Sequence, residues 1–445
     1  IAPEDIRDVQ TNLVRSHAAG AGEPLPEELV RAMMLLLAAS LARGHSGARP
    51  VLVERLAAML EARVHPVVPS IGSVGASGDL APLAHVALTL LGEGEATGPD
   101  GRIRPSAEVL AEARIAPVPL EAKEGLALLN GTHLMAAMAL LAVHDAERLV
   151  AAALGSAAMA LDACRGTDAP LDERIHALRR QPGQIAVAAR LRQLLEGSTI
   201  LPAHLIDDPR VQDPYCLRCT PQVLGAALDG IAHVRRVTEH ELGAVSDNPL
   251  VFPAGDDPLA GDIVSGGNFH GMPLAIALDH LAVCLCHVAG IAERRVYWLL
   301  AARDPENPVQ PYLSPRPGLH SGLMITQYTA AACCNELQHL AGPASVGNVP
   351  TSAGVEDYNS FGPAAGFQAR GALDRATTVI AIEYLVMAEG LEAQRPLRSG
   401  DGVETRHARL RREVAPLRED RPPAPDIAAI ERLIRAGAFA EDEPG

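Results

Sequence analysis

The segment Gly75-Ala76-Ser77-Gly78-Asp79 carries the residue types with the greatest chemical potential in this chain. One interpretation is a loop that caps the next helix, with Ser77 or Asp79 accepting its first backbone N–H groups. A second interpretation is a serine nucleophile. The nucleophile elbow of hydrolases requires G-x-S-x-G, and the residue two positions after Ser77 is Asp79. The hydrolase pattern therefore fails at its last position.

A third interpretation is cyclisation of the backbone itself. The backbone nitrogen of Gly78 can attack the carbonyl carbon of Ala76 and close a five-membered ring. Loss of two waters, one of which takes the Ser77 hydroxyl, leaves a 4-methylidene-imidazol-5-one. The residue types suit this reaction because Gly78 has no Cβ to obstruct the attack and Ala76 is small. The product is a strong electrophile that needs no external cofactor.

The elements that must position this loop are expected to be helical. The chain is 48% hydrophobic and only 3% aromatic, and it is rich in the helix formers Ala and Leu. Two prolines and three glycines exclude a regular element over 65–78, and 93–105 is typical of a surface hairpin. The hydrophobic pattern predicts helices over 5–18, 27–43, 50–63, 79–91, 121–164, 220–246, 270–301, 320–342, 366–392 and 425–437.

Charge and hydropathy exclude two kinds of partner. The net charge is -16 and there is no dense Lys/Arg block, so we expect no nucleic acid partner. The longest apolar stretch, 125–163, is interrupted by polar residues such as Asn130 and His144. It leaves no clean membrane span of about 20 residues, and we expect no membrane partner.

The cysteines indicate a reducing compartment. Their number is seven, which is odd, and the chain is too large to need disulfides. We therefore expect a cytoplasmic protein. Cys216 and Cys219 form a C-x-x-C pair, but no second pair follows at ligand spacing. Buried thiols are the preferred interpretation, and no metal is expected.

Further motifs accompany the loop in order along the chain. They are Ser16-His17-Ala18-Ala19-Gly20, the segment 72–85, Leu129-Asn130-Gly131-Thr132, Gln212-Asp213-Pro214-Tyr215 with Leu217-Arg218-Cys219, Ser246-Asp247-Asn248-Pro249, Ser265-Gly266-Gly267-Asn268-Phe269-His270, Ser321-Gly322-Leu323-Met324 and Glu356-Asp357. With these motifs the sequence resembles the aromatic amino acid ammonia-lyases and aminomutases over nearly its whole length, and histidine ammonia-lyases most of all.

The resemblance implies a mainly α fold, a long helical bundle of the fumarase/aspartase-like type. It implies a homotetramer whose active sites are each shared by three subunits. The range 1–445 would be a single catalytic unit, with an N-terminal part (1–165) that carries the cofactor loop, a central bundle (166–392) and a C-terminal segment (393–445). Family members carry a catalytic tyrosine in a Y-G-x-N-T-G-F-G loop, which we expect upstream of Ile1.

The resemblance also implies roles for individual residues. The ring made from Ala76-Ser77-Gly78 takes up the substrate's amino group, a base removes a proton from the β-carbon, and ammonia leaves. Arg218 is expected to bind the substrate carboxylate, because a guanidinium suits bidentate pairing. The other expected site residues are Asn130, Gln212 and Tyr215 around the ring, Phe269 beside the substrate, and Asp247 and Asn248 as support for the ring.

Substrate choice depends on fewer residues. Ser16-His17 resembles the selectivity pair of histidine ammonia-lyases, and Glu356 offers a carboxylate that can pair with an imidazole but not with a phenyl ring. We therefore expect L-histidine as substrate and trans-urocanate as product. A tyrosine or phenylalanine ammonia-lyase, or an aminomutase, is the alternative within the family. A non-catalytic helical assembly protein is the alternative outside it. His133 either contacts substrate or simply lies satisfied within a helix.

Overall fold

The computed structural model describes residues 2–206, 208, 210–255, 260–304 and 307–440. Within these ranges the chain forms 16 α-helices and seven short strands. The expected mainly α fold is confirmed. Ile1 and residues 441–445, the two ends of the expected catalytic unit, lie outside the described residues. Contacts between residues divide the chain into two compact units, each assembled from three separate stretches.

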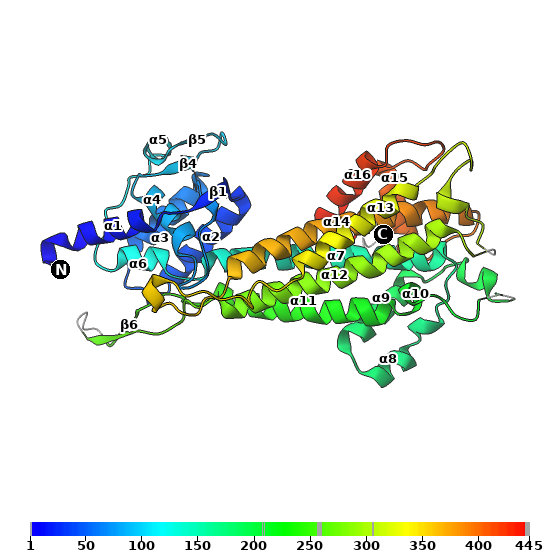
Figure 1. The fold of residues 1–445 in the computed structure, drawn as a ribbon, viewed down its shortest axis with the longest axis horizontal. Helices are drawn as coiled ribbons and strands as arrows, with labels where there is room; N and C mark the ends of the chain where they lie inside the picture. The colour runs from blue at the N-terminus through cyan, green and yellow to red at the C-terminus, as the bar shows by residue number, and fades with distance from the viewer. Residues whose placement is uncertain (1, 207, 209, 256–259, 305–306, 441–445) are drawn as a thin grey trace. The chain divides into compact units, whose positions relative to one another are not determined.

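Unit 1 consists of Ile1–Leu141, Val234–Asp279 and Pro343–Phe367. Its helices lie close together in the blue and cyan part of Figure 1. They are α1 (Ile6–His17), α2 (Glu27–Leu41), α3 (Pro50–Glu61), α4 (Leu80–Leu90), α5 (Ser106–Glu112) and α6 (Glu124–Leu129). The first four were expected within a few residues of these bounds. Helix α5 was not expected.

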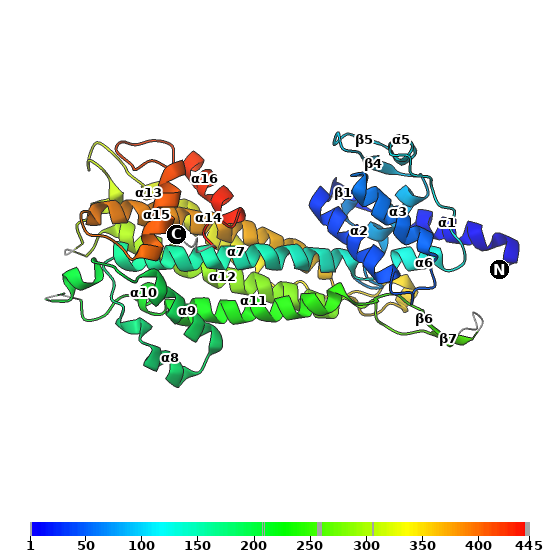
Figure 2. The same ribbon diagram turned by 180° about the vertical axis from the view of Figure 1, so that it is seen from behind.

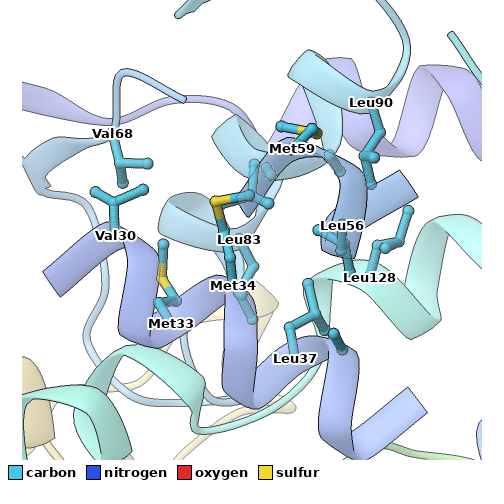
Figure 3. Packing of buried hydrophobic residues seen from close by; sticks show 14 of the residues in the cluster. Val30, Met33, Met34, Leu37, Leu56, Met59, Val68, Leu83, Leu90 and Leu128 are labelled. Carbon is cyan, nitrogen blue, oxygen red and sulfur yellow. The ribbon is translucent and has the colours of Figure 1, made fainter. Parts of the chain in front are cut away.

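The core of unit 1 is made of interlocking aliphatic and methionine side chains (Figure 3). They come mainly from α2, α3, α4 and α6, whose apolar positions recur at helical spacing. Figure 3 labels Val30, Met33, Met34, Leu37, Leu56, Met59, Val68, Leu83, Leu90 and Leu128, each at most 2% exposed. Burial of each such side chain contributes on the order of 1.5–3 kcal/mol.

All of the described strands are short and pair antiparallel. Strand β1 (Ala21–Pro24) pairs with β3 (Pro69–Ile71), and β6 (Leu250–Pro253) pairs with β7 (Gly261–Val264). Strand β4 (Glu95–Thr97) lies between β2 (His65–Pro66) and β5 (Ile103–Pro105). The hairpin expected over 93–105 is thus present. The expectation of no regular element over 65–78 was wrong at its start, because the prolines of β2 and β3 occupy strand ends that tolerate them.

Four long helices have one end in each unit: α7 (His133–Ala163), α11 (Thr220–Leu242), α12 (Met272–Ala301) and α14 (Gly362–Gln394). The single helix expected over 121–164 is in fact two, α6 and α7. The helical conformation is interrupted at Asn130-Gly131, where Asn130 is extended (φ -93, ψ 119) and Gly131 has φ 143. At this break Gly131 forms an isolated parallel bridge with Gly78. The broken helix therefore positions the loop that contains Ser77.

Unit 2 consists of Ala142–His233, His280–Gly342 and Gln368–Gly445. Its parts of the long helices run side by side (Figures 1 and 2). Its other helices are α8 (Glu173–Arg179), α9 (Pro182–Leu194), α10 (Tyr215–Arg218), α13 (Met324–Leu340), α15 (Asp401–Glu413) and α16 (Ala424–Arg435). Helices α8, α9, α10 and α15 were not expected. The division of the chain near 165 and 392 stays a prediction.

Helix α12 is long and apolar enough to cross a membrane by length and composition alone. However, 61% of its most apolar window is buried inside the protein, which is the behaviour of a core helix.

Cys216 and Cys219 are free and half-buried, rather than buried as expected. Among the described residues, no group of three or more His, Cys, Asp or Glu is arranged to hold a metal ion.

Candidate active site

A cavity of about 550 Å³ lies in unit 1 beside the Gly75–Asp79 loop. Its walls come from the end of α1, the loop itself, the start of α4, α6 with the residue that follows it, and three connecting segments. It is lined by His17, Ala76, Ser77, Leu80, Leu126, Asn130, Asn248, Gly267, Phe269, His270, Val355, Glu356, Asp357 and Tyr358. Seven of the residues predicted from the sequence therefore share one cavity, although they are far apart in the chain.

Two glycines allow the loop its shape. Gly75 (φ 68) and Gly78 (φ 76) both have left-handed backbone conformations. A Cβ on Gly75 would lie 2.1 Å from Ser360 Oγ, and a Cβ on Gly78 would lie 2.1 Å from the carbonyl oxygen of Gly131. The loop is therefore packed too tightly on both sides for any side chain at these two positions.

Segment 360–361 anchors the N-terminal end of the loop by hydrogen bonds. The backbone N–H of Ser360 donates to the Gly75 carbonyl (3.2 Å), and the Ser360 hydroxyl donates to the same oxygen (3.1 Å). The N–H of Phe361 donates to the Val74 carbonyl (2.9 Å). Ser73 adds a bond within the loop, because its hydroxyl donates to the Gly78 carbonyl at 3.2 Å. None of these anchors was predicted from the sequence.

Asp79 anchors the C-terminal end of the loop by hydrogen bonds. Its carboxylate accepts the backbone N–H groups of Leu134 (2.9 Å) and Met135 (3.1 Å), so it caps the first turn of α7 rather than its own helix α4. Its own N–H donates to the Gly131 carbonyl at 2.7 Å. Complete burial raises the pKa of the Asp79 carboxyl to about 7, and its hydrogen bonds from Met135, Ser73 and Leu134 oppose that shift.

The Ser77 hydroxyl points at a carboxylate. It donates to Oε1 of Glu356 at 3.0 Å, and the Thr351 hydroxyl donates to Oε2 of the same carboxylate at 3.1 Å. A short bridge fixes this arrangement, because the N–H of Thr351 donates to the Glu356 carbonyl (2.9 Å). Glu356 was predicted as a site residue, and Thr351 was missed because nothing in its sequence context marks it.

Asn130 links the cavity to a buried ion pair. Its amide nitrogen donates to the Asn248 carbonyl (3.1 Å) and to Asp247 (3.3 Å), and Lys123 pairs with Asp247 at 2.6 Å. Asp247 is 2% exposed and Lys123 compensates its charge. Within the described residues, Asn130 Oδ1 is buried and has no hydrogen-bond partner. An unpaired acceptor at the wall of a cavity is suited to a ligand donor.

The side chain of His17 lines the cavity and that of Ser16 does not. Nδ1 of His17 donates to the Leu13 carbonyl (2.8 Å), an assignment that leaves Nε2 as the acceptor. The Ser16 hydroxyl donates to the same carbonyl at 3.0 Å and lies on the exposed side of α1. Half-buried Phe269 contributes an apolar wall to the cavity.

Three predicted site residues lie in unit 2, at or near the short helix α10. Gln212 is exposed, and Tyr215 is 70% exposed with the Arg218 guanidinium 4.7 Å from its ring centroid. Nε of Arg218 is buried and has no hydrogen-bond partner among the described residues. None of the three lines the cavity of unit 1.

The loop fits the ring that the sequence suggests. Gly78 has no side chain, and its close contact with Gly131 leaves no room for one. Ala76 is small and 7% exposed. In the described part of the chain the Gly78 N–H donates no hydrogen bond, so its nitrogen is not engaged elsewhere. The residues therefore meet the steric requirement for attack of the Gly78 nitrogen on the Ala76 carbonyl.

Known proteins are similar to this chain over nearly its whole length. The model of the family described as "Aromatic amino acid lyase" matches residues 1–412. A histidine ammonia-lyase from Sorangium cellulosum is 48% identical over 439 residues, which are 99% of this chain and 85% of that protein. A second, from Koribacter versatilis, is also 48% identical and covers 99% of this chain and 86% of its own length.

Solved structures of similar fold include related enzymes. A crystal structure of histidine ammonia-lyase from Trypanosoma cruzi has a TM-score of 0.91 at 38% identity, covering 99% of this chain and 82% of that one. A tyrosine aminomutase from Streptomyces globisporus has a TM-score of 0.90 at 36% identity, covering 98% and 84%. The chain belongs to the aromatic amino acid lyase family. Both the family and the enzyme class expected from the sequence, a carbon–nitrogen lyase, are confirmed.

Proposed function

We propose that this protein eliminates ammonia from L-histidine to give trans-urocanate, using a methylidene-imidazolone made from Ala76-Ser77-Gly78. The observation that carries the proposal is that the loop, Glu356 and His17 line one cavity. When formed, the ring supplies an electrophilic carbon that withdraws electrons from the substrate amine. The relatives named histidine ammonia-lyase, at 48% identity, support the choice of substrate.

The residues of unit 1 are suited to hold an imidazole. Glu356 offers a carboxylate oxygen and His17 offers Nε2, so a ring with two nitrogens finds polar partners that a phenyl or phenol ring cannot fully use. Phe269 packs against the apolar edge of the substrate imidazole. Asn130 Oδ1 is an unpaired acceptor for a donor such as the substrate amine. Asp247 and Asn248 orient Asn130 by hydrogen bonds.

We propose that the protein is a homotetramer and that Gln212, Tyr215 and Arg218 of one subunit complete the cavity of another. Exposure of Gln212 and Tyr215 in the single chain supports this assignment, as does the unpaired Nε of Arg218. In the completed site Arg218 binds the substrate carboxylate as a bidentate partner, and Tyr215 and Gln212 orient the substrate. The enzyme is expected in the cytoplasm.

The test uses the full-length protein. L-Histidine, L-tyrosine and L-phenylalanine are offered separately, and the ultraviolet absorbance of the conjugated acid product is followed. Growth of absorbance with L-histidine alone supports the proposal, and Glu356→Gln is expected to raise KM for L-histidine. Growth with L-tyrosine instead would show that Glu356 and His17 do not set the substrate. If none of the three amino acids gave a product and the intact mass of the protein equalled the mass encoded by its sequence, the lyase chemistry would be refuted.

A further inference from the structure

We propose that Glu356 has a second role, as the proton carrier that makes the electrophilic ring before any substrate binds. This inference rests on the proposed function, because it concerns the ring made from Ala76-Ser77-Gly78. The Ser77 hydroxyl, which must leave when the ring forms, donates to Glu356 Oε1 at 3.0 Å.

The hydrogen bonds around the loop separate into two kinds. Cyclisation consumes the Ala76 carbonyl oxygen, the Ser77 N–H, Cα–H and hydroxyl, and the Gly78 N–H. The anchors to Val74, Gly75 and Asp79, and the Ser73 bond to the Gly78 carbonyl, use none of these atoms. Within the described residues, the Ser77–Glu356 bond is the one hydrogen bond to an atom that is lost. The carboxylate is therefore placed at the leaving group and not merely at the loop.

The chemistry balances without an oxidant or another reagent. First the Gly78 nitrogen bonds to the Ala76 carbonyl carbon and its proton passes to the carbonyl oxygen. That oxygen leaves as water with the Ser77 N–H proton, which creates a C=N bond. The Ser77 Cα–H is then acidified by the flanking carbonyl and C=N groups. Glu356 takes this proton and delivers it to the Ser77 oxygen, which leaves Cβ as the second water and creates the Cα=Cβ bond.

Thr351 makes Glu356 suitable for this step. Its hydroxyl holds Oε2, so that Oε1 is directed at Ser77, and the carboxylate returns to its starting charge after each proton transfer. Removal of the Ser77 oxygen also removes the only donor that Oε1 has among the described residues. Oε1 then becomes free to accept an N–H from the imidazole of the substrate. One carboxylate thus serves the precursor loop first and the substrate afterwards.

The experiment follows ring formation directly, as the loss of two waters in the intact mass of newly synthesised full-length protein over time. General acid–base assistance is typically worth roughly 100-fold or more in rate. We expect Glu356→Gln, which keeps the hydrogen bond but cannot carry the proton, to slow the loss of the second water roughly 100-fold. Thr351→Val should slow it less. Asp262→Asn is the matched control, since Asp262 is an exposed carboxylate of unit 1 that does not line the cavity, and its rate should equal that of the wild type.

A second variant separates proton transfer from misfolding. Glu356→Ala should fold with wild-type circular dichroism, lose the second water slowly, and recover its rate when formate is added as a diffusible carboxylate. Loss of both waters from Glu356→Gln at the wild-type rate would overturn the inference and leave the proposed lyase function standing. A wild-type protein that loses no water would instead overturn the ring, and with it the proposed function.

Discussion

Protonation of buried His133 should destabilise the protein in mild acid. This side chain begins α7 and is 5% exposed, and neither ring nitrogen has a hydrogen-bond partner among the described residues. Burial lowers its pKa from 6.5 to about 4. The unfolded chain therefore binds a proton between these two values and the folded chain does not. The resulting stability is present above pH 6.5 and is lost as pH falls towards 4.

The size of the effect follows from the same two values. At about 1.4 kcal/mol per pH unit, the interval from 6.5 to about 4 is worth about 3 kcal/mol. We expect the free energy of unfolding of the wild type, relative to His133→Gln, to fall by about 2–3 kcal/mol between pH 7.5 and 4.5. Gln is uncharged throughout this range and of similar reach, so the variant should lack this part of the pH dependence.

Urea unfolding followed by circular dichroism, at one fixed protein concentration, measures the difference at each pH. His144→Gln is the matched control, because His144 lies on the same helix but is exposed; its curve should follow that of the wild type. A difference between wild type and His133→Gln that stays constant from pH 7.5 to 4.5 would refute the reasoning. It would mean that His133 gains a partner or solvent that stabilises its charge.

Three more changes probe the site. Gly78→Ala places a Cβ 2.1 Å from the Gly131 carbonyl oxygen at φ 76, so it should lower the melting temperature by several degrees and block the loss of two waters, as seen by calorimetry and intact mass. Lys123→Met leaves the charge of Asp247 buried and unpaired, which should cost about 3–5 kcal/mol in urea unfolding. Asn130→Ala removes a polar group that faces the cavity and should lower kcat/KM for L-histidine by roughly 100-fold.

Helices whose apolar residues recur regularly could be predicted from the sequence, and helices held by few apolar residues could not. Helices α2 and α3 follow the apolar pattern closely. Helix α15 is missed because it is dominated by charges, and its buried apolar residues are only Val403 and Leu410. The break between α6 and α7 was also missed. Asn130-Gly131 is a modest local signal, and the break is stabilised by Asp79 and Gly78 from a distant part of the chain.

The site shows a similar limit. The Gly/Ser composition of 75–79 is enough to suggest cyclisation, because that reaction depends on neighbouring residues. The pairing of Ser77 with Glu356 is not, because 279 positions separate them and spacing says nothing about such a contact. The family motifs supplied Glu356, whereas Thr351 has no motif and was found only through its hydrogen bond.

The chain positions of the loop's anchors also fix when the ring can form. The bonds that hold Val74 and Gly75 come from Ser360 and Phe361, which are synthesised long after the loop. Glu356 arrives from the same late segment. A loop with two left-handed glycines is entropically costly to fix without partners. Under the proposed chemistry, ring formation therefore follows packing of segment 343–367 into unit 1, and an incompletely folded chain keeps an ordinary serine instead of a reactive electrophile.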